Sequence, residues 1–366
     1  MRKVSLIQGS RKNKKKWSSL KWATTVLLLL LIVIAHPTSL HSMELVVVNK
    51  DVSRFSLVAR TVNQLQAFEY TKELTKDEYA GRNSGTEGCE KAADWIASQF
   101  KAWNLKPYKE DSYFQPFSPP LSFHSTSNVI GYIPARNKKS KQSIILGAHY
   151  DHLGKDRSGN IYRGANDNAS GTGTMMEIVR TLSECILITD INIVFIAFSA
   201  EEKGLHGSYF YARNPLFPLS EVVAMINLDM VGTGNGPWEL GTNFERVKLL
   251  DNALKTTLSY YRISYRLASW YLKPVSDHYP FYEKGVPVLF IFRANPSNKG
   301  GYHTLKDTID TVDPKNLGEC GKMAVVILLF ACGNHVIVIP KIVMSHVPSF
   351  MIPVMRTGLI FSDSSL

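Results

Sequence analysis

The sequence predicts an α/β protein, a three-layer sandwich in which a central mixed, mainly parallel sheet has helices on both faces. Two observations support this: short apolar runs alternate with amphipathic segments from residue 128 onward, and polar residues follow several of the runs. Alternating strands and helices are typical of a parallel sheet, whose ligands bind beyond the carboxyl ends of the strands. Strands are expected at residues 129–133, 143–149, 191–199, 222–229 and 287–292.

Helices are expected where apolar residues recur at helical spacing. One lies within residues 89–105, where Ala93, Ile96, Phe100 and Trp103 share a face. Residues 323–331 are all apolar but too few to span a membrane, which takes about 20 residues, so the last helix is expected to be buried. The other helices are expected at residues 51–74, 169–184, 205–213, 244–260 and 314–331.

The excess of basic residues lies at the start of the chain. The 366 residues include 42 Lys and Arg against 31 Asp and Glu, a formal net charge of +11. Eight of the basic residues and none of the acidic ones precede residue 43, so the rest has 34 basic and 31 acidic residues. A nucleic-acid-binding surface needs a basic field of its own. We therefore expect no nucleic-acid partner.

The basic start is followed by an apolar run of ten residues, 26–35. A short apolar run behind a basic region is typical of a secretory signal. Residues 1–42 are therefore expected to be a signal peptide or an uncleaved membrane anchor, which is the only membrane contact that we expect. The protein is predicted to be exported, periplasmic or secreted, with one domain at residues 43–334 and an unassigned tail at residues 335–366.

The composition fits one globular domain with a large core. Apolar residues make up 45% of the chain, and no repeat is visible. The cysteines are too few and too scattered for a disulfide scaffold, and they lack zinc-finger spacing. Buried thiols with at most one or two disulfides are expected for Cys89, Cys185, Cys320 and Cys332.

His149 and Asp151 lie two residues apart at the end of the expected strand 143–149. Residues two apart on a strand project from the same face. His149 can therefore bind a metal ion while Asp151 accepts the other ring N–H and holds the tautomer. The pair alone is weak evidence, because a histidine in a core or on a surface also fits it.

Three further carboxylates follow in two segments. Asp167 sits in a turn of glycine, asparagine and small residues (GANDNASG), where it is either a turn residue or a bridge between two cations. Glu201 and Glu202 come just after the apolar strand 191–199. Adjacent carboxylates near a buried sheet edge are costly unless a cation is present. One of the two can bind metal while the other faces a water, and a solvated pair on a surface turn is the alternative.

Asp229 ends another expected strand, and His303 lies in a loop before the last helix. Each is unremarkable alone. Together the set offers each of two metal ions one histidine, one terminal carboxylate and a share of Asp167, with positions left for water and substrate. This composition suits zinc, so we predict two Zn²⁺ ions per chain.

The chain resembles the co-catalytic di-zinc aminopeptidase family, of the bacterial leucyl aminopeptidase type, which is related to glutamate carboxypeptidase and glutaminyl cyclase. Six ordered blocks carry the resemblance: HYDHLG, GANDNASG, FIAFSAEEKGLHGS, MINLDMVG, SDHYPFYEKGVPVLF and YHTLKDTIDTVD. Together they are far more specific than any one block. The resemblance implies a zinc exopeptidase-like fold and makes residues 43–334 the catalytic domain.

The resemblance also implies a role for each candidate residue. Asp167 would be shared by two zinc sites, one completed by His149 and Asp229 and the other by Glu202 and His303. Glu201 would act as the general base, and Asp151 would orient His149.

Around this set the sequence is less specific. Asp277, His278 and Tyr302 are candidates for substrate binding. Leu305 and Lys306 replace a proline and a polar residue that are common in the family, which alters the loop near His303 without removing a ligand.

The predicted function is hydrolysis of N-terminal residues from peptides with a free N-terminus, by a zinc-dependent aminopeptidase. A carboxypeptidase on the same fold is an alternative that would need a cationic pocket, for which Arg293 and Lys273 are available. A glutaminyl cyclase, which usually keeps one zinc ion, and a catalytically silent binding module are the others.

Overall fold

The structure is a computed structural model that describes residues 46–48, 52–119, 124–268, 271–293, 301–332 and 336–340. The predicted leader, residues 1–42, and most of the predicted tail, residues 335–366, lie outside them, so export stays a prediction. Of the two compact units in the chain, residues 46–338 form the one that contains the candidate site. Among the described residues, no helix is both long enough and apolar enough to cross a membrane.

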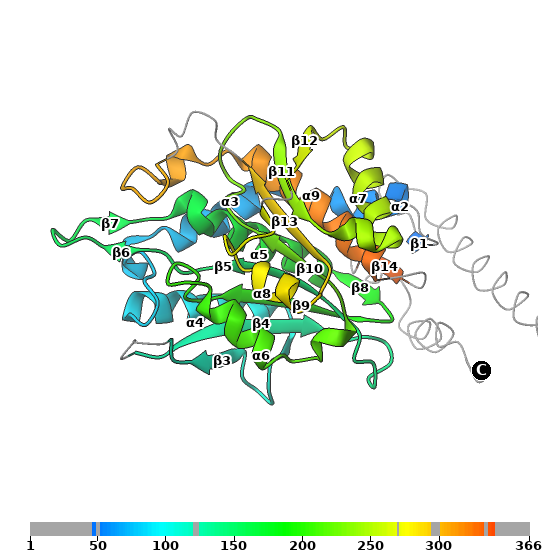
Figure 1. The fold of residues 1–366 in the computed structure, drawn as a ribbon, viewed down its shortest axis with the longest axis horizontal. Helices are drawn as coiled ribbons and strands as arrows, with labels where there is room; N and C mark the ends of the chain where they lie inside the picture. Colours follow the sequence, from blue (N-terminus) through cyan, green and yellow to red (C-terminus); the bar gives the residue numbers. More distant parts are fainter. Residues whose placement is uncertain are drawn as a thin grey trace, which may run out of the picture. The chain divides into compact units, whose positions relative to one another are not determined.

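A mixed sheet runs through the middle of this unit (Figure 1). Its strands are β2 (Lys106–Pro107), β3 (Phe114–Phe117), β4 (Thr126–Ile133), β5 (Ser143–His149), β9 (Asn192–Phe198), β10 (Val222–Leu228), β11 (Trp238–Thr242), β12 (Tyr265–Leu267) and β13 (Val288–Arg293). Their order is β12-β11-β13-β10-β5-β9-β4-β2, and β3 also pairs with β4. The central strands β13, β10, β5 and β9 are parallel, and antiparallel pairing begins at β11 on one side and β4 on the other.

Helices cover both faces of the sheet (Figure 1). The larger core, on one face of the sheet, includes residues of α2 (Val52–Ala59), α3 (Gln64–Leu74), α4 (Glu87–Ala102), α5 (Ser170–Ser183), α7 (Lys248–Tyr260) and α9 (Pro314–Ala331). The smaller core, on the other face, includes residues of α6 (His206–Arg213) and α8 (Tyr279–Glu283). A small sheet of β1 (Val46–Val48), β14 (Val336–Pro340) and β8 (Cys185–Ile188) and a hairpin of β6 (Gly154–Lys155) and β7 (Ile161–Tyr162) complete the described strands.

Strand β5 shows why the central strands are apolar throughout. Successive side chains of a strand point to opposite faces, so Ile144 and Leu146 enter the larger core while Ile145 enters the smaller one. All three are fully buried. Because its side chains alternate between the two cores, the strand stabilises both of them. Truncating a buried Ile or Leu to Ala costs about 2–5 kcal/mol. The central strands therefore form a rigid base for the residues that follow them.

The predicted sandwich is confirmed, with two differences. Parallel pairing is limited to the four central strands and the edge pair of β11 and β12, because β11 and β4 run antiparallel to their central neighbours β13 and β9. Residues 51–74 form two helices, since Asn63 begins a new helix by accepting the backbone N–H groups of Leu65 and Gln66.

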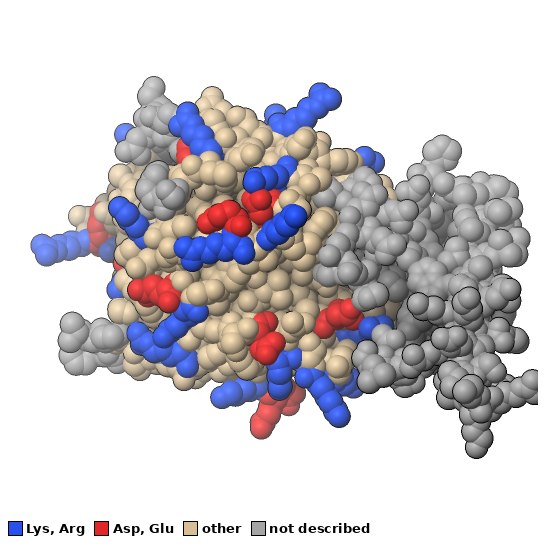
Figure 2. Space-filling model, turned by 45° about the vertical axis from the view of Figure 1, so that its right-hand side comes forward, with Lys and Arg blue, Asp and Glu red and all other residues tan. Residues whose placement is uncertain are grey.

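Surface charge and cysteines agree with the sequence. Figure 2 shows Lys and Arg side chains interspersed with Asp and Glu on the face that it draws, without a continuous basic field. Cys89, Cys320 and Cys332 are buried free thiols, so the buried-thiol interpretation holds for these three.

Candidate metal and catalytic site

The candidate site lies beyond the carboxyl ends of three neighbouring parallel strands. Strand β5 ends at His149, β9 leads into Glu201 and Glu202, and β10 is followed at once by Asp229. Because β9, β5 and β10 are parallel neighbours, their ends meet at one edge of the sheet. The sheet itself thus brings together residues that are 80 positions apart in the chain.

A tight turn at residues 164–169 delivers Asp167 to the same edge. Gly164 has φ +54°, and a Cβ there would lie 2.2 Å from the Asp167 carbonyl oxygen and 2.5 Å from the His152 ring, so only glycine fits. Asn168 anchors the turn, because its side chain donates to the Leu228 carbonyl oxygen at 2.9 Å. The turn is thereby tied to the end of β10.

His149 faces two of the predicted ligands. Its Nε2 lies 3.5 Å from Asp167 Oδ1 and 3.4 Å from Asp229 Oδ1. The other oxygen of Asp229 accepts a hydrogen bond from Ser276 Oγ at 2.6 Å, and Ser276 in turn accepts from Asn227. This chain of hydrogen bonds holds one Asp229 oxygen and leaves the second for the cleft.

His303 faces the other predicted ligands. Its Nε2 lies 3.1 Å from Asp167 Oδ2 and 3.0 Å from Glu202 Oε2. Two ligand atoms at 2.0–2.1 Å from a tetrahedral zinc lie about 3.3 Å apart. The four distances around His149 and His303 bracket this value, and the two oxygens of Asp167 serve different histidines.

The electrostatics of the site fit bound cations. Six carboxylates gather here, namely Asp151, Asp167, Glu201, Glu202, Asp229 and Asp277. In the described structure, Asp167 Oδ2, Asp229 Oδ1 and His303 Nε2 are buried without a hydrogen-bond partner. Buried polar atoms are normally satisfied, so orphans that converge on one place indicate a ligand. The donor set of carboxylates and imidazoles suits zinc.

The same crowding shifts the ionisation of the site. Burial raises the pKa of Glu201 well above its usual range, and the Asp277 carboxylate adds to this rise. Burial alone would lower the pKa of His149, but the Glu201 and Asp229 carboxylates outweigh it and raise that pKa. Without metal the cleft therefore holds extra protons, which bound cations would displace.

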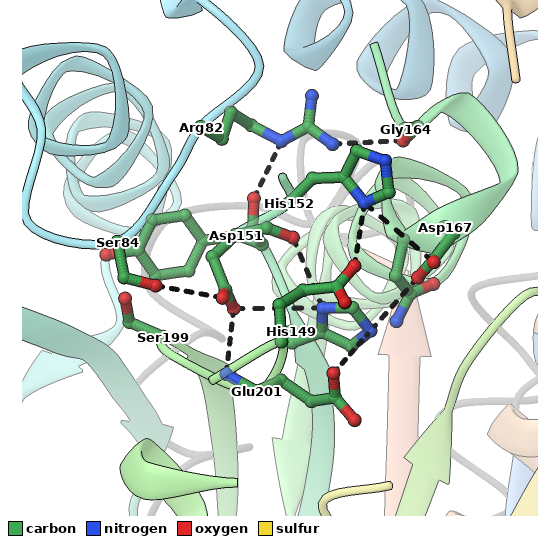
Figure 3. A network of polar contacts seen from close by, with 12 residues as sticks. Arg82, Ser84, His149, Asp151, His152, Gly164, Asp167, Ser199 and Glu201 are labelled. Atoms are coloured by element: carbon green, nitrogen blue, oxygen red, sulfur yellow. Dashed lines mark hydrogen bonds and ion pairs between the residues drawn. The ribbon is translucent and has the colours of Figure 1, made fainter. Parts of the chain in front are cut away.

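Asp151 links His149 to the loop after β9 that carries Glu201 and Glu202 (Figure 3). Its Oδ1 accepts the backbone N–H of Glu201 at 3.2 Å, and its Oδ2 accepts from Ser84 Oγ at 2.9 Å. The His149 Nδ1 lies 3.7 Å from Asp151 Oδ1 and 3.3 Å from the Asp151 carbonyl oxygen. Asp151 therefore lies outside β5 and holds the Glu201 backbone as well as facing the histidine ring.

Three residues of the site were not predicted. His152 Nδ1 lies 2.8 Å from Glu202 Oε1, and the buried Arg82 donates to the carbonyl oxygens of Tyr150 and Gly164 at 2.7 and 2.9 Å (Figure 3). Asp307 accepts the backbone N–H groups of Asn166 and Asp167 at 2.7 and 3.0 Å. The only sequence signals were a second histidine in HYDH and an acid four residues after His303.

The candidate substrate residues differ in accessibility. Asp277 and His278 are fully buried, and the His278 ring stacks on Phe290 with its Nε2 2.7 Å from the Tyr271 carbonyl oxygen. This geometry favours a packing role for His278. Tyr302 is 52% exposed and stacks on His303 at 3.9 Å, so it is the accessible member of the three.

The fold and the set of candidate ligands are of the zinc exopeptidase type. Residues 128–328 match the family model described as Peptidase family M28, and the chain belongs to this family. Among curated relatives, it is 32% identical over 212 residues to Aminopeptidase YwaD of Bacillus subtilis (strain 168), a match that covers 54% of this chain and 43% of YwaD. It is 27% identical over 245 residues to a probable leucine aminopeptidase of Arthroderma otae, covering 64% of each.

Solved structures share the fold at low sequence identity. A zinc aminopeptidase from Bacillus subtilis superimposes with a TM-score of 0.61 at 20% identity, covering 73% of this chain and 94% of that one. A glutaminyl cyclase from Porphyromonas gingivalis gives a TM-score of 0.60 at 19% identity, covering 72% and 97%. The family and fold predicted from the six sequence blocks are thus confirmed.

Proposed function

We propose that this protein is a zinc-dependent aminopeptidase that hydrolyses the N-terminal peptide bond of its substrates at a site with two zinc ions. The observation that carries the proposal is the position of Asp167, whose two oxygens face His149 and His303 separately. One site would be completed by Asp229 and the other by Glu202. The names of the M28 relatives point to the same activity.

Zinc bound here would polarise the scissile carbonyl and lower the pKa of a coordinated water toward neutrality. In this proposal Glu201 would act as the general base, taking a proton from the attacking water and returning it to the leaving amine. Its side chain is 12% exposed, so it reaches the cleft, and its backbone is held by Asp151. Burial raises the pKa of Glu201 in the metal-free cleft, and bound cations would lower it again, so that the carboxylate would be ionised and able to accept a proton.

The surplus of carboxylates accounts for a preference for chain ends. A free α-amine is a cation and is attracted to the acidic cleft, whereas an N-blocked peptide offers no such charge. Peptides with a free N-terminus are therefore the proposed substrates.

The alternatives find less support. Arg293, one cation available to a carboxypeptidase, forms an ion pair with Glu319 at 3.0 Å, donates to Asn316 at 2.7 Å and lies over the Trp238 ring at 4.7 Å. Lys273 is exposed. A glutaminyl cyclase shares the fold, but a cyclase with one zinc ion needs only one of the two proposed ligand sets.

The test is hydrolysis of leucyl-p-nitroanilide and of its N-acetylated analogue, with zinc counted in the same sample. The proposed aminopeptidase cleaves only the substrate with the free amine, loses its activity when a chelator removes the metal, and holds two zinc ions per chain. Cleavage of the blocked analogue alone would reject the proposal. One zinc ion per chain with cyclisation of an N-terminal glutamine would identify the cyclase, and full zinc content without turnover would identify a silent module.

A further inference from the structure

A hollow of about 340 Å³ lies beside the loop that carries Glu201 and Glu202, between the end of β3 and helix α6. Its lining includes Phe117, Gly204, His206, Tyr209, Phe210 and Arg213. The α6 residues are spaced by three or four positions, so they form one face of the helix. The Phe117 and Phe210 rings stack at 5.1 Å and make its wall apolar.

One part of the lining, Gly204, lies in the loop that carries Glu201. The backbone N–H groups of Gly204 and Leu205 both donate to the Glu201 carbonyl oxygen at 2.9 Å, and that of His206 donates to Ala200 at 2.9 Å. The rise of an α-helix is 1.5 Å per residue, so Arg213 lies about 10 Å along the axis from His206. An extended peptide covers about 3.3 Å per residue, so this length corresponds to about three residues.

The far end of the hollow is positively charged. Arg213 is exposed, lies over the Tyr209 ring at 5.6 Å and makes no ion pair with a carboxylate of the described residues. Burial lowers the pKa of His206, and the nearby cations Arg213 and Lys203 lower it further. Glu283 of α8 accepts the Tyr209 hydroxyl at 3.0 Å. An anion with an apolar neighbour is therefore the complementary ligand.

We propose that this hollow binds the C-terminal part of a short peptide substrate, with Arg213 pairing with the terminal carboxylate and an apolar side chain lying against Phe117 and Phe210. The inference rests on the proposed aminopeptidase activity, because the N-terminus must lie at Glu201 for the rest of the peptide to run along α6. It adds a length preference, for peptides of about three to five residues with a free C-terminus. Arginine and a carboxylate form bidentate hydrogen bonds, which suit this recognition.

The experiment compares the peptide leucyl-glycyl-glycyl-phenylalanine with its C-terminal amide. An exposed ion pair contributes up to about 1 kcal/mol, so wild-type protein should have a kcat/KM about fivefold higher for the free acid. Half-molar salt should reduce this preference by screening. Arg213→Gln should remove it, and Arg246→Gln, which changes an exposed arginine on another element, should keep it.

Each contrary result has its own meaning. Equal rates for acid and amide in the wild type, or a preference that survives in Arg213→Gln, would overturn the subsite while leaving the aminopeptidase intact. Failure of the wild type to release p-nitroaniline from leucyl-p-nitroanilide, or release of phenylalanine before leucine from the free acid, would overturn the proposed function and the subsite with it.

Discussion

His152 and Glu202 face each other across 2.8 Å, from His152 Nδ1 to Glu202 Oε1. The other oxygen of Glu202 faces His303, so the two histidines hold the carboxylate from both sides. Burial lowers the pKa of His152 to about 3, so its ring is neutral and its Nδ1–H donates to Glu202. His152 also lies close enough to Asp167 and Glu202 for the three to hold a metal ion, and either binding the metal or orienting Glu202 would affect metal affinity.

We therefore expect His152→Phe, which keeps the ring and removes Nδ1, to weaken zinc binding about 10- to 100-fold. Competition with a chromophoric chelator measures this affinity. His206→Phe is the matched control, because His206 lies on α6 outside the ligand set, and it should bind zinc as the wild type does. Unchanged affinity in His152→Phe would remove the residue from the metal site.

Glu201 is expected to act on the proton and not on the metal. Glu201→Gln should lower kcat by about two to four orders of magnitude, as expected for loss of a general base, and should keep the full zinc content. Glu202→Gln is the companion variant and should lose zinc instead. The contrast matters because Glu201, His149 and Asp229 also lie close enough together to hold a metal ion. A Glu201→Gln protein that loses one zinc ion would show that Glu201 is a ligand.

The sheet explains which parts of the site could be predicted from the sequence. The buried central strands are apolar throughout, so their ends, and the acids and histidines that follow, are visible in the sequence. Strand β5 has the predicted bounds, and β10 is one residue shorter than expected. Edge strands such as β12, whose residues are all exposed, carry no such pattern and were not predicted.

The supporting residues could not be predicted, because they act through backbone atoms that only the fold brings close. Arg82 bonds carbonyl groups up to 82 positions away, and Asp307 bonds amides 140 and 141 positions away. Backbone groups have no residue type, so a sequence pattern cannot name such partners. His152 differs, because its partner is a side chain, but its role depends on the loop geometry after β5.

Arg82 should be essential for the stability of the site. Its guanidinium is fully buried and donates to the carbonyl oxygens of Leu74, Tyr150, Arg163 and Gly164. Lysine has fewer hydrogen-bond donors than arginine and lacks its planar geometry. Arg82→Lys therefore leaves buried carbonyl groups unpaired and should lower the free energy of unfolding by about 2–4 kcal/mol. Urea denaturation measures the change.

The control for Arg82 is Arg157→Lys, at an exposed position in the hairpin of β6 and β7, where a change within about 0.5 kcal/mol is expected. Arg82→Lys should also weaken zinc binding, because Gly164 begins the turn that carries Asp167. Wild-type stability in Arg82→Lys would mean that the carbonyl groups find other donors.

Asp307 should make stability depend on pH in a defined direction. Burial raises its pKa to about 7, above the ordinary value of 3.8. The folded state then binds a proton that the unfolded state has lost, so this contribution to stability is complete below about pH 4 and is lost as the pH rises through about 7.

In the metal-free protein, the free energy of unfolding of the wild type relative to Asp307→Asn should therefore fall between pH 4 and 7 and level off above pH 8. Urea titrations in EDTA across this range give the difference, and Asp310→Asn, an exposed position in the same segment, should show no such slope. A difference for Asp307→Asn that rises with pH would instead mean that the two backbone N–H groups of Asn166 and Asp167 keep this carboxylate ionised in the folded protein.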